Sequence, residues 1–334
     1  MHTLRRFLLG ITFLLTLVIT GILIIQVFGL PMPQIRYGLP MERQENAETS
    51  SSSSVPERSI ITRLSLTPFR QKHRSYVGVV VENHEDARLH HRGLEKADII
   101  QEYFAEGFIT RFFALFDRAD LPKMVGPVRS LRPYVLDGSL PWQPVIFHAG
   151  GSPEALERSE DPSTGLRAFN GLWLEEHFLR MDNAPAPHDV FLPRERIRDL
   201  LSETSAIAIP VPLYKTGSVG SGSGASSIRV NYFSSLHNVQ YRYDQWLGRY
   251  TRTNGGIQSA AHPRNIVFLA TQTKEIGPYG RLSIKTVGTG PVLLFRSGKV
   301  IKGTWSRESI QEPFVFRDTK GATLLFANGQ TWMT

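Results

Sequence analysis

The chain has 334 residues and no cysteine, and its 38 Lys and Arg residues outnumber its 30 Asp and Glu residues, a formal charge of +8. The absence of cysteine excludes a disulfide-stapled scaffold, a thiolate zinc site, an iron–sulfur cluster and a cysteine nucleophile. The apolar share of 41% is typical of a globular protein, and the length predicts about two domains.

The positive charge is divided unevenly along the chain. Residues 1–75 carry +5, residues 76–227 carry −6 and residues 228–334 carry +9. An acidic middle beside a basic C-terminal third predicts two domains with different surfaces. These surfaces either attract each other or leave the basic part free for an external anionic partner.

The N-terminal residues predict the compartment. Residues 1–6 include two arginines and precede the apolar run Phe7–Leu30, which as a helix would be about 36 Å long and could cross a hydrocarbon core. A cleaved secretory signal is the alternative, but its apolar core is usually shorter and ends at small residues. We therefore expect an uncleaved single-pass anchor with residues 1–6 in the cytoplasm and the rest outside, a topology that disfavours nucleic acid as a partner.

Residues 31–75 are predicted to be a disordered tether. They contain the serine run Ser50–Ser54 and several glutamates, and such polar composition cannot bury enough apolar surface to fold. The tether would let the folded part work away from the membrane.

Residues 76–215 are predicted to form an N-terminal domain of the α/β or α+β class. β-branched and aromatic runs predict strands at Tyr76–Val81, Ile99–Phe104, Thr110–Phe116 and Pro144–His148. Amphipathic spacing and prolines at first turns predict helices at Gly93–Ala97, Pro133–Leu140, Leu172–Arg180 and Pro193–Glu203.

The Gly/Ser-rich residues 216–227 are predicted to be a flexible linker. Residues 228–334 then predict a mostly β C-terminal domain, because short apolar runs alternate with Gly- and Asn-containing turns. We expect its strands at Ile228–Phe233, Val239–Tyr243, Asn265–Ala270, Arg281–Thr286, Pro291–Phe295, Phe314–Arg317 and Thr323–Phe326.

The densest polar cluster of the N-terminal domain is Gly126–Arg132. A Gly-Pro turn followed by Arg129, Ser130 and Arg132 offers guanidinium groups and free N–H groups at the start of a predicted helix. That combination binds phosphate or carboxylate oxygens. Alternatively, both arginines pair with acids of their own domain.

Two glutamates lie in an otherwise apolar stretch. Glu102 and Glu106 are expected to be partly buried, and a buried carboxylate needs a partner or a raised pKa. Arg111 on the next predicted strand is the expected structural partner; a catalytic or ligand-binding role is the alternative.

Two histidines are the remaining candidates. His148 precedes Gly150, Gly151 and Ser152, a loop that can approach a ligand closely, and His188 lies in a proline-rich loop. Both could act as acid or base near neutrality. No histidine spacing typical of a metal site is present, so we predict no metal.

Together these motifs resemble the YerB-like lipoprotein family, a bacterial two-domain family of unknown function. The resemblance covers about residues 76–334 and rests mainly on Val81-Glu82-Asn83, Glu106-Gly107, Gly126–Arg132, His148–Ser152, Pro187-His188, Tyr243-Asp244, Gly303–Trp305 and Gly329–Trp332. It implies a membrane-tethered extracytoplasmic protein and adds Asn83 to the ligand-binding candidates. Family members usually carry a lipobox cysteine, which this chain lacks, so the helix would be its anchor.

The sequence therefore leads to three hypotheses. The first is an envelope protein that binds an anionic glycopolymer or lipid phosphate through Arg111, Arg129 and Arg132, without a cofactor. The second is an envelope hydrolase or phosphoglycosyl transferase with Glu102 or Glu106 as base and His148 or His188 as acid. The third is a structural partner of another envelope protein.

Overall fold

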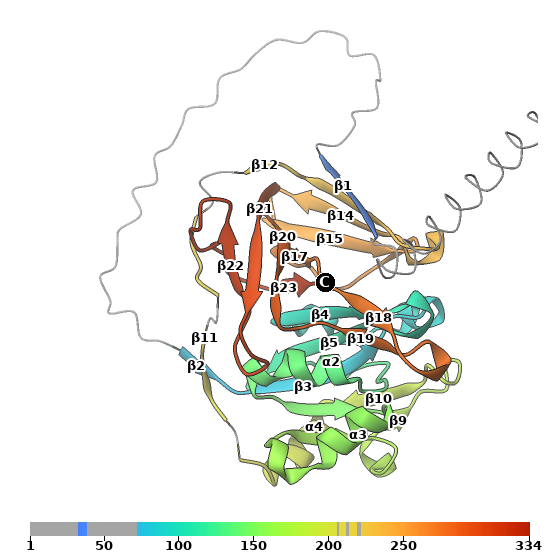
Figure 1. Cartoon of the computed structure of the whole chain (residues 1–334). Coiled ribbons are helices and arrows are strands. Elements are labelled where there is room, and N and C mark those ends of the chain that lie inside the picture. The colour runs from blue at the N-terminus through green and yellow to red at the C-terminus, as the bar shows by residue number, and fades with distance from the viewer. Residues whose placement is uncertain (1–32, 39–71, 206, 212–213, 219–221) are drawn as a thin grey trace, which may run out of the picture.

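One sheet of eleven strands runs through both halves of the chain (Figure 1). The computed structural model describes residues 33–38, 72–205, 207–211, 214–218 and 222–334. The N-terminal half contributes β3 (Tyr76–Glu82), β4 (Ile99–Phe104), β5 (Thr110–Asp117), β7 (Val145–His148) and β8 (Arg167–Asn170). The C-terminal half contributes β12 (Ser223–Gly224), β17 (Asn265–Leu269), β20 (Gly288–Arg296), β21 (Lys299–Arg307), β22 (Val315–Asp318) and β23 (Thr331–Met333).

The strand order is β12-β21-β20-β17-β23-β4-β5-β3-β7-β8, and β22 pairs with β21. The two halves meet where β23, the last strand of the chain, pairs in parallel with β4 on one side and with β17 on the other. Thr331 lies opposite Ile99, and Trp332 lies opposite Ile100. The predicted domains are therefore joined by backbone hydrogen bonds and do not form separate units.

A second sheet of five antiparallel strands covers part of one face of the long sheet. Its order is β1 (Gln34–Gly38), β13 (Ser227–Asn231), β14 (Val239–Asp244), β15 (Arg249–Asn254) and β16 (Ile257–Gln258). Tyr241 and Tyr250 of this sheet share an apolar core with Phe112 and Trp332 of the long sheet. Burial of these aromatic side chains stabilises the contact between the sheets.

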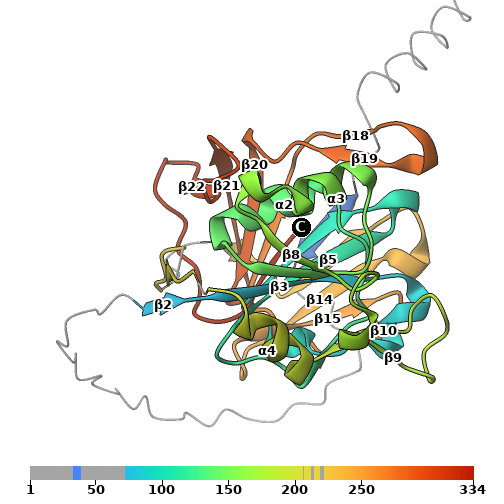
Figure 2. The same cartoon turned by 90° about the horizontal axis from the view of Figure 1, so that it is seen from below.

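The three described α-helices cover both faces of the N-terminal part of the long sheet (Figure 2). They are α2 (Pro133–Ser139), α3 (Pro153–Glu160) and α4 (Arg194–Ser202). Successive side chains of a strand point to opposite faces: Val80 packs in one core with Leu136 of α2, whereas Val79 packs in the other with Ile197 of α4. Because both faces of β3 are covered, all of its residues are buried, as the apolar run predicts.

The remaining elements are short. The small strands are β2 (Lys72–Arg74), β6 (Met124–Val125), β9 (Leu179–Arg180), β10 (Val190–Pro193), β11 (Ile209–Val211), β18 (Thr273–Glu275) and β19 (Leu282–Ile284). The 3₁₀ helices are η1 (Glu85–His90), η2 (Leu94–Lys96), η3 (Glu106–Phe108), η4 (Leu140–Trp142), η5 (Pro162–Thr164), η6 (Glu175–His177), η7 (Ser235–His237) and η8 (Pro278–Gly280).

The mixed N-terminal part and the mostly β C-terminal part agree with the predicted fold class. Four local predictions were wrong. The strand predicted at Thr323–Phe326 is reduced to two isolated bridges, at Thr323 and at Phe326. The tether predicted at 31–75 is wrong at its two ends, which contain β1 and β2, paired with β13 and β11; its residues 39–71 lie outside the described residues. The linker predicted at 216–227 contains β12, which pairs with β21. The helix predicted at Leu172–Arg180 is η6 and β9, since β9 pairs with β10.

The anchor helix predicted at Phe7–Leu30 lies outside the described residues, as does the cytoplasmic segment 1–6. Within the part of the chain that the structure describes, every helix is too short or too polar to span a bilayer.

We predict that the folded part unfolds in one cooperative transition, because both halves share a sheet and a core. Trp332→Ala should lower the free energy of unfolding by about 3–5 kcal/mol, since the Trp332 side chain has no exposed surface. The matched control is Trp246→Ala, at a residue that is 90% exposed. Calorimetry checks this; two separate transitions in the unmodified protein would contradict the shared core.

Candidate functional site

The strands β3, β7 and β8 are parallel neighbours and therefore end at the same edge of the sheet. We call this place the carboxyl edge and define it by Glu82–His84, His148–Ser152 and Asn170, which stand at or directly after the three strand ends. Ligands of open α/β sheets bind outside the carboxyl ends of parallel strands. A ligand site is therefore expected at the carboxyl edge.

The predicted anion-binding segment Gly126–Arg132 lies along this edge. The Arg129 N–H donates to the Val80 carbonyl over 2.9 Å, and the Ala149 N–H donates to the Arg129 carbonyl over 3.0 Å. The Ser130 hydroxyl donates to the Ala149 carbonyl over 3.2 Å. The segment thus bridges β3 and β7, which holds the Arg129 side chain at the carboxyl edge.

Glu82 is the centre of a buried polar cluster at this edge. Its Oε2 atom lies 2.7 Å from Nε of Arg129 and 2.7 Å from Nδ1 of His188. Glu82 and His188 are each 8% exposed. A carboxylate bonded to one imidazole nitrogen orients the ring and leaves the other nitrogen available, the arrangement found in many acid–base sites.

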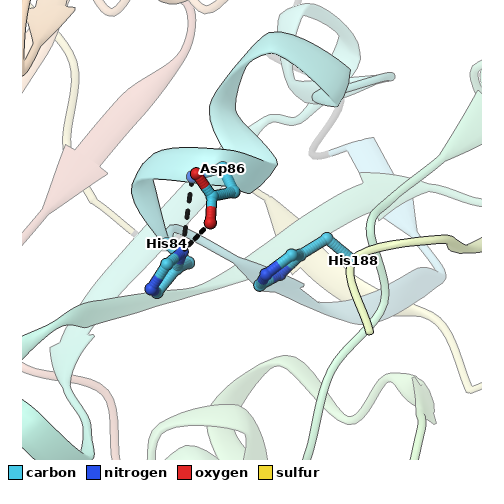
Figure 3. Close-up of side chains that lie close together, drawn as sticks. All are labelled: His84, Asp86 and His188. Atoms are coloured by element: carbon cyan, nitrogen blue, oxygen red, sulfur yellow. Dashed lines mark hydrogen bonds and ion pairs between the residues drawn. The ribbon is translucent and has the colours of Figure 1, made fainter. Parts of the chain in front are cut away.

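A second histidine stacks on His188 (Figure 3). The ring centroids of His84 and His188 are 4.9 Å apart with 16° between the planes, and Nδ1 of His84 lies 3.4 Å from Oδ2 of Asp86. The potential ligand atoms of His84, Asp86 and His188 lie within 4.8 Å of one another. Metals bind imidazole in the ring plane, and stacked rings direct their nitrogens side by side, so this geometry favours a hydrogen-bonding cluster over a metal centre.

Sequence reasoning missed Glu82, His84 and Asp86 as candidates, although it quoted Glu82 in a motif. The signal was present: these residues follow directly on the strand predicted at Tyr76–Val81. Polar residues at the end of a fully buried strand indicate a candidate site as much as the loop after His148 does.

The loop after β7 is held by hydrogen bonds of its own. Nδ1 of His148 lies 2.8 Å from the Gly150 carbonyl, and the Gly150 N–H donates to Oδ1 of Asn170 over 2.9 Å. Gly150 has a φ of 70°, which favours glycine. Burial lowers the pKa of His148 to about 4, so near neutral pH the ring is uncharged and its Nδ1–H can donate to Gly150.

Two buried polar groups of this loop region have no hydrogen-bond partner among the described residues. They are the hydroxyl of Ser152, immediately before α3, and Nδ2 of Asn170. The residues are 8% and 9% exposed. An unpaired buried donor costs free energy, and such a group often marks a place where a ligand completes the hydrogen bonding.

The other predicted arginines lie beside Glu106. Nε and Nη2 of Arg132 donate to the two carboxylate oxygens of Glu106 over 2.6 and 2.8 Å, a bidentate geometry. Nη1 of Arg111 donates to the Ser130 carbonyl over 3.0 Å, and its Nη2 lies 3.8 Å from Glu106. Burial alone would raise the pKa of Glu106, but its contacts with Arg132 hold that pKa below its usual value.

Glu102 lies elsewhere, in the core between the two sheets. Its oxygens accept hydrogen bonds from Thr110 over 2.6 Å, from Trp332 over 2.7 Å and from Nη2 of Arg252 over 3.0 and 3.2 Å. The sequence pointed to Arg111 as its partner, and that expectation was wrong: the partner is Arg252, which is 150 residues away on β15.

Arg252 is enclosed by aromatic rings. Its guanidinium carbon lies 4.3 Å from the ring centroid of Trp332 and 5.3 Å from that of Phe112, distances at which cations are attracted to aromatic faces. Burial would lower the pKa of Arg252, but Glu102 raises it above its usual value. The residue therefore stays charged within the core.

Asn83 belongs to the same network. Its Nδ2 atom donates to Thr110 over 2.6 Å and to Oδ1 of Asn254 over 2.9 Å, while its Oδ1 accepts from Arg88 over 3.3 Å. Asn83 thus joins the two halves.

The predicted site residues fall into three groups in the structure. Seven of them lie at the carboxyl edge: Arg129, Ser130, His148, Gly150, Gly151, Ser152 and His188. Arg111, Arg132 and Glu106 lie next to Ser130, and the side chains of Glu102 and Asn83 point into the core.

Comparison with known proteins gives two family matches and one similar structure. Residues 62–207 match the N-terminal domain, and residues 228–333 the C-terminal domain, of a protein family of unknown function, DUF3048. The chain is 31% identical over 278 residues to "Putative lipoprotein YerB" of Bacillus subtilis, covering 78% of this chain and 80% of that one. The chain belongs to the YerB-like family.

The crystal structure of the YerB protein from Bacillus subtilis has the same fold, with a TM-score of 0.65 at 29% identity over 78% of this chain and 90% of that chain. The family resemblance drawn from the sequence motifs is therefore confirmed. In this YerB-like protein the two family domains meet across β4 and β23.

We predict that Arg252→Ala lowers the free energy of unfolding by about 3–5 kcal/mol, because it leaves the Glu102 carboxylate buried without its cation. Replacing both residues, Glu102→Gln with Arg252→Met, should recover part of that loss. Lys96→Ala is the control, since the Lys96–Asp120 pair is exposed and contributes less than about 1 kcal/mol. Urea unfolding checks this; equal losses for Arg252→Ala and Lys96→Ala would contradict it.

We predict that the protein loses stability as the pH falls from 6.5 towards 4. The pKa of His148 is about 4 in the folded protein against 6.5 for the free side chain. Between pH 6.5 and pH 4 the unfolded chain therefore binds more protons than the folded protein, and the free energy of unfolding falls. Above pH 6.5 His148 is uncharged in both states, and its contribution to stability is fully present. His148→Asn retains a donor for Gly150 but no titrating ring. When the pH is lowered from 7 to 5, the free energy of unfolding of His148→Asn should fall by about 2 kcal/mol less than that of the unmodified protein.

The measurement is urea unfolding at both pH values, with the exposed His73→Asn as the control. Burial also lowers the pKa of His91 to about 4, so His148→Asn should reduce the pH dependence without abolishing it. An unchanged pH dependence in His148→Asn would contradict the assignment.

Proposed function

We propose that this protein is an extracytoplasmic, membrane-associated envelope protein that binds phosphate groups of an anionic glycopolymer or lipid at the carboxyl edge. The membrane association is supported by the apolar run Phe7–Leu30 behind two arginines and by the name lipoprotein that its Bacillus relative carries. The folded part would then lie outside the membrane.

The observation that carries the proposed binding is the pair of unpaired donors, the Ser152 hydroxyl and Nδ2 of Asn170. Oδ1 of Asn170 already accepts from the N–H groups of Gly150 and Leu172 over 2.9 and 3.1 Å, whereas its amide nitrogen has no acceptor among the described residues. Ser152 precedes the first residue of α3, where the N–H groups and the helix dipole favour negative charge. Phosphate oxygens are acceptors of the kind that these two donors lack.

The neighbouring charges support an anionic ligand. Arg111, Arg129 and Arg132 face two carboxylates, Glu82 and Glu106, so these five groups together include one more cation than anion. Each arginine retains N–H groups beyond those that its carboxylate uses.

An exposed aromatic residue supports a sugar-containing ligand. Trp173 is 60% exposed, and its backbone N–H donates to the backbone carbonyl of Asn170 over 3.0 Å, so both residues belong to the turn that follows β8. Exposed tryptophan combines an apolar face with a polar edge, a combination suited to sugar rings. The ligand that fits best is thus a phosphate-bearing glycopolymer.

A second candidate function rests on the Glu82–His188 pair. A histidine 2.7 Å from a carboxylate is suited to proton transfer, as an envelope hydrolase or transferase requires. Glu102, Glu106 and His148, the other residues proposed for that chemistry, each have separate hydrogen-bond partners in the structure.

Ser152→Ala tests the binding proposal with little risk to the fold, because the hydroxyl makes no hydrogen bond within the described protein. We expect it to weaken binding of poly(glycerol phosphate), and of polyprenyl phosphate in phosphatidylcholine vesicles, by about tenfold or more. The matched control is Ser226→Ala, which removes another unpaired buried hydroxyl far along the chain. Calorimetric titration measures both.

An uncharged polysaccharide should not bind. Unchanged affinity in Ser152→Ala and in Arg129→Ala with Arg132→Ala, each checked for its fold, would overturn the proposal. Release of phosphate or sugar from the polymer during the titration would support the second candidate.

A further inference from the structure

A cavity of about 370 Å³ lies where the two halves of the chain meet. Its walls come from β4 and β5 of the N-terminal half, from β17 and β20 of the C-terminal half, from β1 and β13 of the second sheet and from the hairpin β18–β19. The volume is within the range of about 300–1,000 Å³ that is usual for small-molecule sites. The cavity is separate from the carboxyl edge, since it lies on the other side of β5 from β3.

The walls of this cavity are apolar. They include Ile35, Phe104, Phe268, Leu293, Phe314 and Met333. The polar side chains that contribute to the lining include Gln101 and Thr110, and both are already engaged: Gln101 donates to the Gly138 carbonyl over 3.1 Å, and Thr110 donates to Glu102 over 2.6 Å. The part of a ligand enclosed by these walls should therefore be hydrocarbon.

The rim of the cavity is positively charged. Lys285 lines the cavity and is exposed, and it belongs to no ion pair among the described residues. The hairpin β18–β19 also carries Lys274 and Arg281 against one acid, Glu275. An apolar cavity with a free cation at its rim suits a molecule with a hydrocarbon chain and an anionic head.

We propose that this cavity binds the hydrocarbon chain of an anionic single-chain amphiphile, with the carboxylate or phosphate of the head at Lys285. The chain would be a fatty acyl chain or a polyprenyl chain, which share this chemistry. Binding there does not depend on the phosphate site proposed at the carboxyl edge.

The position of the cavity along the chain supports a ligand taken from the membrane. Pro33 and Ile35 line it, and Pro33 follows the end of the apolar run Phe7–Leu30 by three residues, which span at most about 10 Å. This step rests on the membrane association proposed above: if that run ends at the bilayer surface, a wall of the cavity lies beside the lipid headgroups.

The test uses the full chain in phosphatidylcholine nanodiscs with a diazirine-bearing palmitate as the probe. After irradiation, peptide mapping by mass spectrometry should find the label on β17, β20 or β19, and unlabelled palmitate or polyprenyl phosphate should compete it away. The better competitor of the two identifies the source of the chain. A protein that remains outside the nanodiscs contradicts the anchor, while labelling of these strands in solution would still support the cavity.

Leu293→Trp fills the cavity and should reduce labelling at least fivefold, whereas Ile301→Trp, on β21 outside the lining, should not. Ile284→Trp on the hairpin is the second filling variant, in case Leu293→Trp does not fold. Label confined to Phe7–Leu30, or equal labelling in the filled and control variants, would overturn the proposal.

The charge at the rim is tested by Lys285→Ala against Lys302→Ala, an exposed lysine on β21 outside the lining. Laurate should compete severalfold less well for Lys285→Ala and unchanged for Lys302→Ala. The matched cation, dodecyltrimethylammonium, should compete poorly for the unmodified protein. Equal competition by the anion and the cation would overturn the role of Lys285.

Discussion

The Glu102–Arg252 ion pair is the contact on which the arrangement of the two halves depends. A carboxylate and a guanidinium that are both almost completely buried are each costly without the other, so a fold that buries one must bring in the other. Glu102 lies on β4 and Arg252 on β15, and the Trp332 indole of β23 both donates to Glu102 and lies against Arg252. One ion pair thereby positions the last strand of the chain beside β4 and the second sheet over it. The two family domains for this reason share one sheet and one core in this protein.

The contact between the two halves at Glu102, Arg252 and Trp332 also determines where the two proposed sites lie. The proposed phosphate site would be built from residues of the N-terminal half, at the ends of β3, β7 and β8. The cavity needs both halves, because β4 and β5 form one wall and β17 and β20 another. Glu102 itself contributes to the cavity lining, but its oxygens are saturated by Thr110, Arg252 and Trp332. The same contacts that hold the halves together thus engage the Glu102 carboxylate, so the proposed hydrocarbon ligand would meet no free charge there.

Local pattern was sufficient for some elements and not for others. The runs Tyr76–Val81 and Thr110–Phe116 predicted strands correctly because strands buried on both faces are continuously apolar. The strand β15 (Arg249–Asn254) was missed because two of its three buried positions hold the polar residues Arg252 and Asn254, so the apolar alternation of a half-buried strand is lacking. The burial of Arg252 is explained by its contact with Glu102. No rule of spacing identifies a partner 150 residues away, so the sequence favoured Arg111 on the next strand.

The same limit applies to the candidate site. The Gly126–Arg132 segment and the His148–Ser152 loop were found from composition. The contact of Glu82 with both Arg129 and His188 follows only from the fold.

The pairing of the arginines with glutamates does not argue against anion binding; it changes what kind of binding to expect. Arg129 is held by Glu82 and Arg132 by Glu106, so most of the local charge is cancelled and the long-range attraction for an anion is weak. What remains is a set of donors fixed in position, namely the outer N–H groups of the guanidinium groups, the Ser152 hydroxyl and the Asn170 amide. Their hydrogen bonds act over short distances and depend on geometry, and the side-chain entropy has already been lost on folding. If it binds as proposed, such a site would select an oxyanion by shape, whereas the basic rim around Lys285, with its unpaired charge, would attract an anionic head by charge. The two sites would then recognise the same kind of ligand group by different physical means.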